Sequence, residues 1–421
     1  MREMKDSGIV WIGAIPKRWQ LSKIGSLYTQ RNEKVSDKEY QPLSVTMQGI
    51  LPQLATAAKT DDGDNRKLVR VGDFAINSRS DRRGSCGISP LDGSVSLINI
   101  ILTPRTAMHP GYYNWLFHTT LFADEFYKWG HGIVADLWTT RWQEMKSITV
   151  PVPEYAEQER IAAFLDAECA EIDAVLEKTR ASIEEYKKLK QAVITQAVTK
   201  GIRGDRPMKD SGIEWIGDIP KEFKTLQLKF LCKLITDGTH FSPSTVETGF
   251  PYITAGDVHG IGLDYNSAKR ISEEDFNLLV NQGCQPLKGD VLLVKDGATT
   301  GRVGFADSDV PCVILSSVAM LRPADNINGH YLMYLLASNF LQNQILVSMA
   351  GSAMPRITLT KLSKYIGLLS PLSEQQEIAD YLDEKCAGID ALIAQKQQYL
   401  TEIENYKKSL IYEYVTGKRE V

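Results

Sequence analysis

Residues Met4 to Lys17 read MKDSGIVWIGAIPK, and residues Met208 to Lys221 read MKDSGIEWIGDIPK. Twelve of the fourteen positions are identical, although the two stretches lie 204 residues apart. A second motif, Glu-Gln-x-x-Ile-Ala-x-x-Leu-Asp-x-x-Cys-Ala-x-Ile-Asp, begins at Glu157 and again at Glu374. The chain is therefore one module written twice, with a period far longer than the repeats of about 20–50 residues that build solenoids. This duplication predicts an object that resembles a covalent homodimer with approximate two-fold symmetry.

The bulk composition is that of a globular protein with several domains. The chain has 421 residues, of which 43% are hydrophobic and 24% are charged, which is ordinary for such proteins. No apolar run reaches the roughly 18 residues that a membrane-spanning helix needs, and the first residues lack the apolar core of a signal peptide. The six cysteines have no CxxC or CxxH spacing, so neither a disulfide framework nor a zinc site is indicated. We therefore expect a cytoplasmic protein.

The charge is uneven along the chain. The net charge is −4, yet residues 1–153 carry 19 Lys and Arg against 15 Asp and Glu. Residues 373–421 carry 6 against 10. This is not the composition of a protein that binds nucleic acid through overall charge. If DNA is the partner, local basic clusters or other subunits must supply the affinity.

Two long helices are predicted, one in each copy. From Glu157 to about Lys200 there is no proline or glycine, and apolar residues recur at steps of three and four. The stretch from Glu374 to Val415 has the matching pattern, with Gly388 as its one glycine. A helix of about 44 residues rises roughly 66 Å, and its apolar stripe is narrow enough for a coiled-coil seam. We expect the two helices to pack on each other as an antiparallel coiled coil; the alternative is that each packs on its own body.

The segments before the helices form two bodies that share a skeleton but little identity. Gly72-Asp73 matches Gly289-Asp290, and Gly84-x-x-Gly87 matches Gly301-x-x-Gly304, all at an offset of 217. Short β-like runs precede short helices in both, at 112–128 and 331–348. The predicted fold class is α+β, with mainly antiparallel sheets, two long paired helices and a pseudo-two-fold internal repeat. The predicted segments are a first body (1–153), a central helical region (154–206), a second body (207–372) and a C-terminal helical region (373–421).

With these features, the chain closely resembles the specificity (S) subunit of type I restriction–modification systems. The residues that carry the resemblance are the Glu157-Gln158 and Glu374-Gln375 helix starts with their continuations, supported by the MKDSGIxWIGxIPK openings and the Gly-Asp motifs. Asp237-Gly238-Thr239-His240 also looks like an opening often seen in such domains, and the first body departs from it. The resemblance covers essentially the whole chain.

The resemblance implies two target-recognition domains, each of which reads one half of a bipartite DNA target. It further implies that the helical regions bind two methyltransferase (M) subunits, and that restriction (R) subunits join the full complex for translocation and cleavage. Adenine methylation belongs to those partners, so this chain is expected to be non-catalytic. No cofactor is expected on it; S-adenosylmethionine, ATP and Mg are expected on the partner subunits.

The sequence contains no recognisable set of catalytic residues. There is no Asn/Asp-Pro-Pro-Tyr/Phe run of the kind that grips a flipped adenine. The glycine-rich stretch from Gly297 to Gly304 lacks the Lys-Ser/Thr of a phosphate loop. The histidines are isolated. No catalytic, cofactor-binding or metal-binding residue is predicted.

The strongest candidates for DNA contact form one loop in each body. Arg side chains can donate two parallel hydrogen bonds to guanine, and small polar side chains can donate to phosphates. In the first body the candidates follow a β-like run: Asn77, Arg79, Arg82, Arg83 and Ser85. In the second body, at the same offset of 217, they are Lys295, Thr299, Thr300 and Arg302. For the loop in the first body the alternative is a solvated turn in which Asp81 neutralises one Arg.

Weaker candidates lie elsewhere in the bodies. Thr140 and Arg141 precede the first long helix, and Ser352 and Arg356 precede the second. His240 either touches a base edge or caps a turn. Lys59, Arg66, Lys67 and Arg70 either hold phosphates or form a solvated strand edge. The aromatic residues between Trp115 and Trp129 are expected to be core.

Two other classes of function remain open at this stage. A pure interaction scaffold would use the coiled coil as a tether for two ligand-binding bodies. A self-contained methyltransferase or nuclease would show S-adenosylmethionine-dependent or Mg²⁺-dependent activity by itself. The sequence does not give the target bases or the spacer between the half-sites.

Overall fold

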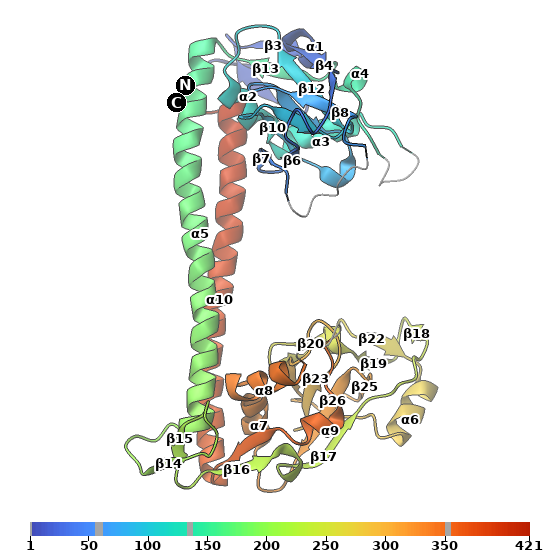
Figure 1. Cartoon of the computed structure of the whole chain (residues 1–421), viewed down its shortest axis with the longest axis vertical. Helices are drawn as coiled ribbons and strands as arrows, with labels where there is room; N and C mark the ends of the chain where they lie inside the picture. The colour runs from blue at the N-terminus through green and yellow to red at the C-terminus, as the bar shows by residue number, and fades with distance from the viewer. Residues whose placement is uncertain (1, 55–61, 133–137, 350–354) are drawn as a thin grey trace. The chain divides into compact units, whose positions relative to one another are not determined.

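The computed structural model describes residues 2–54, 62–132, 138–349 and 355–421. The chain forms two compact units: unit 1 comprises Met1–Arg180 and Gln397–Val421, and unit 2 comprises Ala181–Lys396. Both long helices are continuous, α5 over Tyr155–Lys200 and α10 over Leu372–Val415 (Figure 1). The chain therefore passes from one unit to the other within each helix.

The body of unit 1 contains β1 (Met4–Asp6), β2 (Ala14–Pro16), β3 (Gln20–Lys23), α1 (Ile24–Leu27), β4 (Tyr28–Arg31), β5 (Lys34–Val35), β6 (Leu43–Thr46), β7 (Gly49–Pro52), β8 (Arg66–Val69), β9 (Phe74–Asn77), η1 (Ser80–Arg82), β10 (Cys86–Ile88), β11 (Gly93–Val95), β12 (Asn99–Pro104), α2 (Pro110–Phe117), α3 (Thr120–Lys128), α4 (Trp142–Met145) and β13 (Thr149–Val152).

The body of unit 2 contains β14 (Met208–Asp210), β15 (Asp218–Pro220), β16 (Lys224–Gln227), η3 (Leu228–Phe230), β17 (Cys232–Asp237), β18 (Thr245–Val246), β19 (Phe250–Ile253), η4 (Ala255–Asp257), β20 (Val258–His259), β21 (Gly262–Leu263), β22 (Lys269–Ile271), α6 (Glu273–Asn281), β23 (Val291–Val294), β24 (Val303–Phe305), β25 (Val313–Ile314), β26 (Val318–Pro323), α7 (Gly329–Ala337), α8 (Asn339–Met349), α9 (Leu359–Leu362) and β27 (Ile366–Leu369).

The same central sheet occurs in both units. Its strand order is β10-β9-β12-β4 in unit 1 and β24-β23-β26-β17 in unit 2. Every pairing in these two sheets is antiparallel. Each body is closed by a further antiparallel pair, β13 with β3 and β27 with β16. One parallel ladder, β19 with β25, appears in a second sheet of unit 2. The expectation of mixed bodies with mainly antiparallel sheets is therefore confirmed over the described residues.

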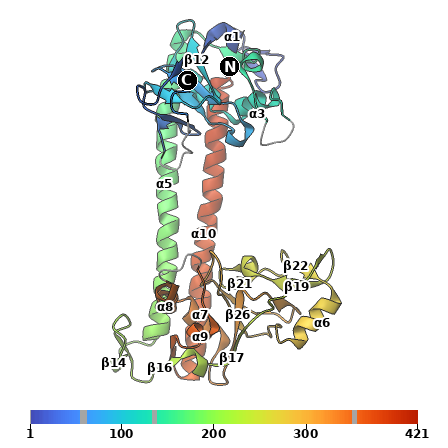
Figure 2. The same ribbon diagram turned by 45° about the vertical axis from the view of Figure 1, so that its right-hand side comes forward.

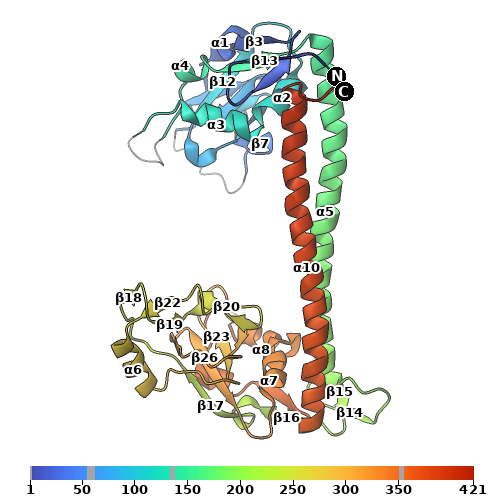
Figure 3. The ribbon, with the colours of Figure 1, turned by 180° about the vertical axis from the view of Figure 1, so that it is seen from behind.

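Alternating side chains place each central sheet between two layers. In unit 1, Phe74 and Ile76 face the core that contains α2 and α3, whereas Ala75 faces a smaller core with residues of β6, β7 and β8 (Figure 3). In unit 2, Val291 and Leu293 join the core that contains α7. Their neighbours Leu292 and Val294 pack on the layer that includes Ile253 and Ile314. This period of two is what a sheet buried on both faces requires.

The short helices differ from the prediction in one respect. The helix expected over 112–128 is two helices, because the Thr119 side chain accepts a hydrogen bond from Phe122 N and starts α3 anew. Ser338 lies between α7 and α8 in the same way, and its hydroxyl donates to Leu335 O. In unit 2, α6 covers the second sheet through Phe276, which stacks on Phe250 at a centroid distance of 4.0 Å (Figure 2).

The two long helices run side by side in opposite directions within each unit. In unit 1, Lys407 Nζ lies 2.6 Å from Asp173 Oδ1, and the Phe164 and Tyr414 rings lie 4.4 Å apart. In unit 2, Lys190 Nζ lies 2.6 Å from Asp390 Oδ2. Asp173 and Lys190 correspond to Asp390 and Lys407 at the offset of 217, so the same pair is formed twice. Each helix start also packs on its own body, so both arrangements considered from the sequence contribute.

The repeated Glu-Gln dipeptides join each helix to its body. Glu157 lies in the first turn of α5, but its carboxylate accepts hydrogen bonds from Trp19 Nε1 at 2.9 Å and from Arg2 and Arg18. Burial opposes ionisation of Glu157, yet these donors outweigh it and hold the pKa of this carboxyl below its usual value. Glu374 accepts from Arg206 Nη1 at 2.6 Å. Each carboxylate therefore anchors its helix start: Glu157 binds residues at the beginning of the first body, and Glu374 binds the segment that precedes the second body.

Substitution of Gly388 tests whether the middle of α10 is helical and exposed at this position. Gly388 lies in the helix with no heavy atom within 4 Å of an added Cβ. Because glycine costs about 0.5–1 kcal/mol in a helix relative to alanine, Gly388→Ala should raise the free energy of unfolding by about that amount. Urea denaturation of the full chain measures it, and Ala387→Gly at the neighbouring exposed position should lower stability equally. A destabilising Gly388→Ala would contradict this placement.

Within the described ranges, every helix is too short or too polar to cross a bilayer.

Candidate nucleic-acid interface

Each unit brings together two loops that the sequence left apart. In unit 1, the loop after β9 pairs with the segment before α4: Thr140 N donates to Ser78 O and Ser80 N donates to Trp138 O, both at 3.0 Å. Arg79 and Thr139 face each other across this antiparallel bridge. We call residues 77–85 with 138–142 the first loop pair.

The second unit repeats this arrangement bond for bond. Ile357 N donates to Lys295 O at 2.8 Å, and Gly297 N donates to Pro355 O at 3.0 Å. Asp296 and Arg356 face each other across the bridge. All four contact positions are those of unit 1 shifted by 217 residues. We call residues 294–302 with 355–358 the second loop pair.

A shared glycine skeleton makes the turns possible. Gly84 and Gly301 have φ of +76° and +98°, and Gly72 and Gly289 have φ of +86° and +93°. Residues with a side chain rarely adopt this region, which explains why these positions match between otherwise divergent bodies. The adjacent aspartates are structural: Asp73 accepts from Arg31 Nε at 2.8 Å, and Asp290 accepts from Arg322 Nε at 2.9 Å.

In the first loop pair, arginines provide the exposed charge. Arg79, Arg82, Arg83 and Arg141 are exposed. Arg83 forms an ion pair with Asp124, and Arg82 Nε lies 3.7 Å from Asp81. The other candidates in this unit support the loop from inside and are buried: Asn77, Ser85 and Thr140. Asn77 Oδ1 accepts from Arg79 N at 3.0 Å, and Thr140 donates to Phe126 O at 2.9 Å.

A hollow of about 360 Å³ lies beside Arg79. Its lining is contributed by both parts of the loop pair and by neighbouring strands: Gln30, Lys67, Ser78, Arg79, Leu97, Ile98, Ile100, Thr139, Thr140, Arg141 and Trp142. Lys67 Nζ donates to Asn99 O at 2.6 Å, and burial lowers the pKa of this amine. Three cations therefore border one concave surface, which suits an anionic or acceptor-rich ligand.

In the second loop pair, the charge is distributed differently. Lys295 is buried, with its side chain 4% exposed, and lies between two carboxylates. Arg302, Arg356 and His240 are exposed. Thr300 donates to Gly297 O at 2.7 Å, and the O of Thr299 accepts from Arg302 N. Ser352 lies outside the described residues.

The remaining basic candidates of unit 1 do not form a single surface. Arg66 is buried, and its guanidinium donates to Ser94 Oγ and Ser94 O. Arg70 is bound to Asp92 and Tyr40. Lys59 lies outside the described residues. The aromatic side chains of α2 and α3 are mainly core: Phe117, Phe122 and Phe126 have no exposed surface.

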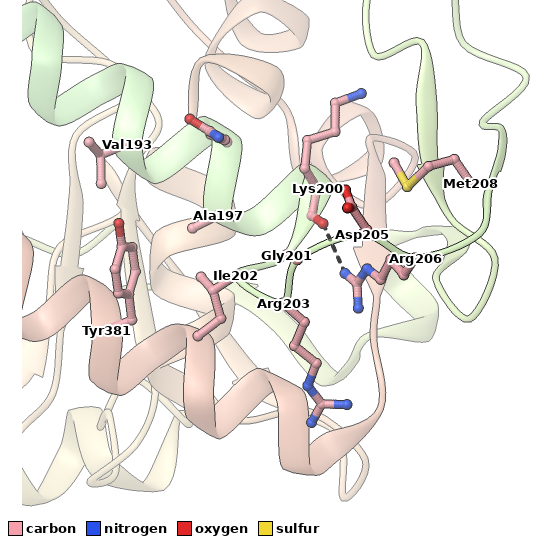
Figure 4. A pocket seen from close by; sticks show the side chains of 12 residues that line it. Val193, Ala197, Lys200, Gly201, Ile202, Arg203, Asp205, Arg206, Met208 and Tyr381 are labelled. Atoms are coloured by element: carbon pink, nitrogen blue, oxygen red, sulfur yellow. Dashed lines mark hydrogen bonds between the residues drawn. The ribbon is translucent and has the colours of Figure 1, made fainter.

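A second hollow, of about 550 Å³, lies at the end of α5, and its lining includes no residue of the second loop pair (Figure 4). Its arginines are occupied: Arg203 binds Glu377, and Arg206 binds Glu374 as well as Lys200 O. This hollow is the joint between the helix end and the segment before the second body.

Over the described ranges, no group of three or more His, Cys, Asp or Glu side chains is placed to hold a metal ion. Each unit thus carries one such loop pair, built on the same backbone hydrogen bonds.

The chain is similar to several known proteins. Residues 220–404 match the family model of the type I restriction modification DNA specificity domain. The chain is 26% identical over 66% of its length to the MjaVIII specificity subunit of Methanocaldococcus jannaschii and 23% identical over 65% to the EcoBI specificity subunit of Escherichia coli. These alignments span 63% and 59% of the two relatives, about three fifths of their lengths. The EcoKI specificity subunit of Escherichia coli K12 is 21% identical over 96% of this chain and 90% of its own.

A solved structure supports the fold. A chain from a study of complex assembly and conformational transition in a type I R-M system has a TM-score of 0.70 at 16% identity, and the alignment covers 96% of this chain and 99% of that one. The resemblance inferred from the sequence is thereby confirmed: the chain is similar to specificity subunits of type I restriction–modification systems. These relatives bear the name of specificity subunits of type I restriction enzymes.

Proposed function

We propose that the chain is the sequence-specific DNA-binding subunit of a type I restriction–modification complex. Each loop pair would read one half of a bipartite target, in the first unit through Arg79 and its neighbours. The repeated loop pairs carry this proposal, because their backbone hydrogen bonds coincide at an offset of 217 while their side chains differ. A constant frame with different side chains is what two dissimilar half-sites require.

The helices are proposed to recruit the catalytic partners. The recurrence of one interhelical ion pair, as Asp173–Lys407 and as Lys190–Asp390, supports an equivalent helix surface in each unit. Two methyltransferase subunits would bind there, together with the S-adenosylmethionine that donates the methyl group to adenine. Restriction subunits, with ATP and Mg, would complete a cleaving complex. The division of the chain into bodies 1–153 and 207–372 and helical regions 154–206 and 373–421 is part of the same proposal.

Replacing Arg79 by Ala tests the DNA-reading role. The chain would be assembled with its methyltransferase subunits, the target would be mapped from methylated adenines, and binding to single-base variants of that target would be measured at physiological salt. We expect Arg79→Ala to weaken discrimination at one half-site by about 1–3 kcal/mol, the contribution of a good bidentate contact, and to leave the other half-site unchanged.

Lys128→Ala is the matched control, because it removes one exposed positive charge from the same unit outside the loop pair. It should leave discrimination intact at both half-sites. If Arg79→Ala instead weakened binding equally to all sequences, Arg79 would be a phosphate contact. If the unmodified complex showed no preference for any sequence, the chain would be an interaction scaffold and the proposal would be wrong.

A further inference from the structure

The second loop pair rests on a buried ion cluster. Lys295 Nζ lies 2.7 Å from Asp296 Oδ2 and 3.3 Å from Asp237 Oδ2. Its side chain is 4% exposed, so this cation does not face the solvent. A buried ammonium needs such partners, because desolvation of an unpaired charge is costly. Lys295 therefore holds the carboxylate of Asp296 in place from the buried side of the loop.

The same carboxylate also holds an exposed arginine. Arg356 Nε lies 3.3 Å from Asp296 Oδ1, an ion-pair distance whose geometry is not that of a hydrogen bond. The Asp296 side chain is 26% exposed and that of Arg356 is 64% exposed. The backbones of the two residues are bridged as well. The guanidinium is thus tethered on its Nε side, while most of its surface remains open to solvent.

The first loop pair has the opposite arrangement. At the positions of Lys295, Asp296 and Arg356 it carries Ser78, Arg79 and Thr139. The arginine there lies on the loop after the central strand, with no carboxylate at an equivalent position. Within the described ranges, the two units therefore present an arginine from opposite sides of the same backbone bridge, and only the second combines it with an Asp–Lys support.

We propose that Arg356 recognises a guanine in the half-site read by the second unit, and that Asp296 and Lys295 are its positioning residues. This inference rests on the proposed DNA-reading function and deepens it. Guanine presents O6 and N7 in the major groove, and a guanidinium can donate to both at once. A tethered side chain loses less conformational freedom on binding than a free one. Lys295 then supports recognition without touching DNA.

Single-base variants of the mapped target provide the test. Arg356→Ala should reduce the preference for G·C at one position of one half-site by roughly 5- to 150-fold. Arg356→Lys should not restore it, because a point charge cannot make two parallel hydrogen bonds. Asp296→Asn, which keeps the shape but removes the charge, should reduce discrimination at that same position by a smaller factor. Lys364→Ala, a change of an exposed lysine outside the second loop pair, should have no effect.

The other half-site serves as an internal control for folding and assembly, because its base preferences should be unchanged in all four variants. The inference is overturned if Arg356→Ala leaves every base preference of the second half-site intact, or if Arg356→Lys restores the preference fully. It is equally overturned if affinity falls uniformly for all sequences. An unmodified complex without any sequence preference would instead refute the proposed function itself.

Discussion

Glu374→Ala is expected to lower the free energy of unfolding by about 3–5 kcal/mol, the range for breaking a buried ion pair. Glu374 is 1% exposed and accepts from Arg206 Nη1 at 2.6 Å. The Arg206 side chain is 12% exposed, and its guanidinium lies 5.0 Å from the centroid of the Phe223 ring. Removal of the carboxylate would leave this cation covered and unpaired, so the joint between α10 and the second body should weaken. Urea denaturation of the full chain measures the loss.

Glu377→Ala is the matched control, one turn further along α10. Glu377 pairs with Arg203, but both side chains are about half exposed, at 47% and 49%. Exposed ion pairs contribute little because water and salt screen them, so stability should hardly change. Similar losses for the two variants would show that Glu374 is not the structural joint described here.

Gly238→Ala is expected to destabilise unit 2 by about 1–3 kcal/mol or more, the range for overpacking a tight site. An added Cβ would lie 1.9 Å from Ile314 O, a backbone atom that cannot move independently. The next residue, Thr239, donates its N–H to the same oxygen at 3.0 Å. The expected result is separation of the end of β17 from β25. Because Asp237 contacts Lys295, weaker discrimination at the second half-site should accompany the loss of stability.

Gly256→Ala controls for the substitution itself. Gly256 is exposed, and its added Cβ would have one neighbour, Thr254 Oγ1 at 3.6 Å, which is ordinary contact. This variant should unfold at nearly the same urea concentration as the parent chain. If Gly238→Ala were equally harmless, the close approach to Ile314 would be wrong.

The duplication made much of the fold predictable. Apolar periodicity and the near absence of proline and glycine located both long helices: the expected starts at Glu157 and Glu374 lie within two residues of the observed starts at Tyr155 and Leu372. The offset of 217 between the Gly-Asp motifs predicted a common skeleton, and the two central sheets have the same strand order. The division of each short helical segment into two helices was missed, although Thr119 and Ser338 are the residues at which those breaks occur.

The site was less accessible to sequence reasoning. The loop after β9 and the segment before α4 were separate candidates, and their contact depends on hydrogen bonds such as Thr140 N to Ser78 O, about 60 positions apart in the chain. The offset of 217 relates residue 78 to residue 295 and residue 140 to residue 357, so both loops have counterparts in the second copy. This correspondence was available in the sequence. The sequence contains no pattern that indicates the burial of Lys295. This residue has the appearance of an exposed cation in the sequence, but it lies between two carboxylates in the structure.

The most direct test of the account exchanges one body for the other. Residues 224–369, from β16 to β27, would be replaced by a second copy of residues 20–152, from β3 to β13. Methylated adenines would then be mapped in cells that supply the methyltransferase subunits. The account predicts a new target that contains the first half-site twice and has lost the second. An unchanged target, in a chain that still assembles and methylates DNA, would show that base recognition does not reside in the two bodies.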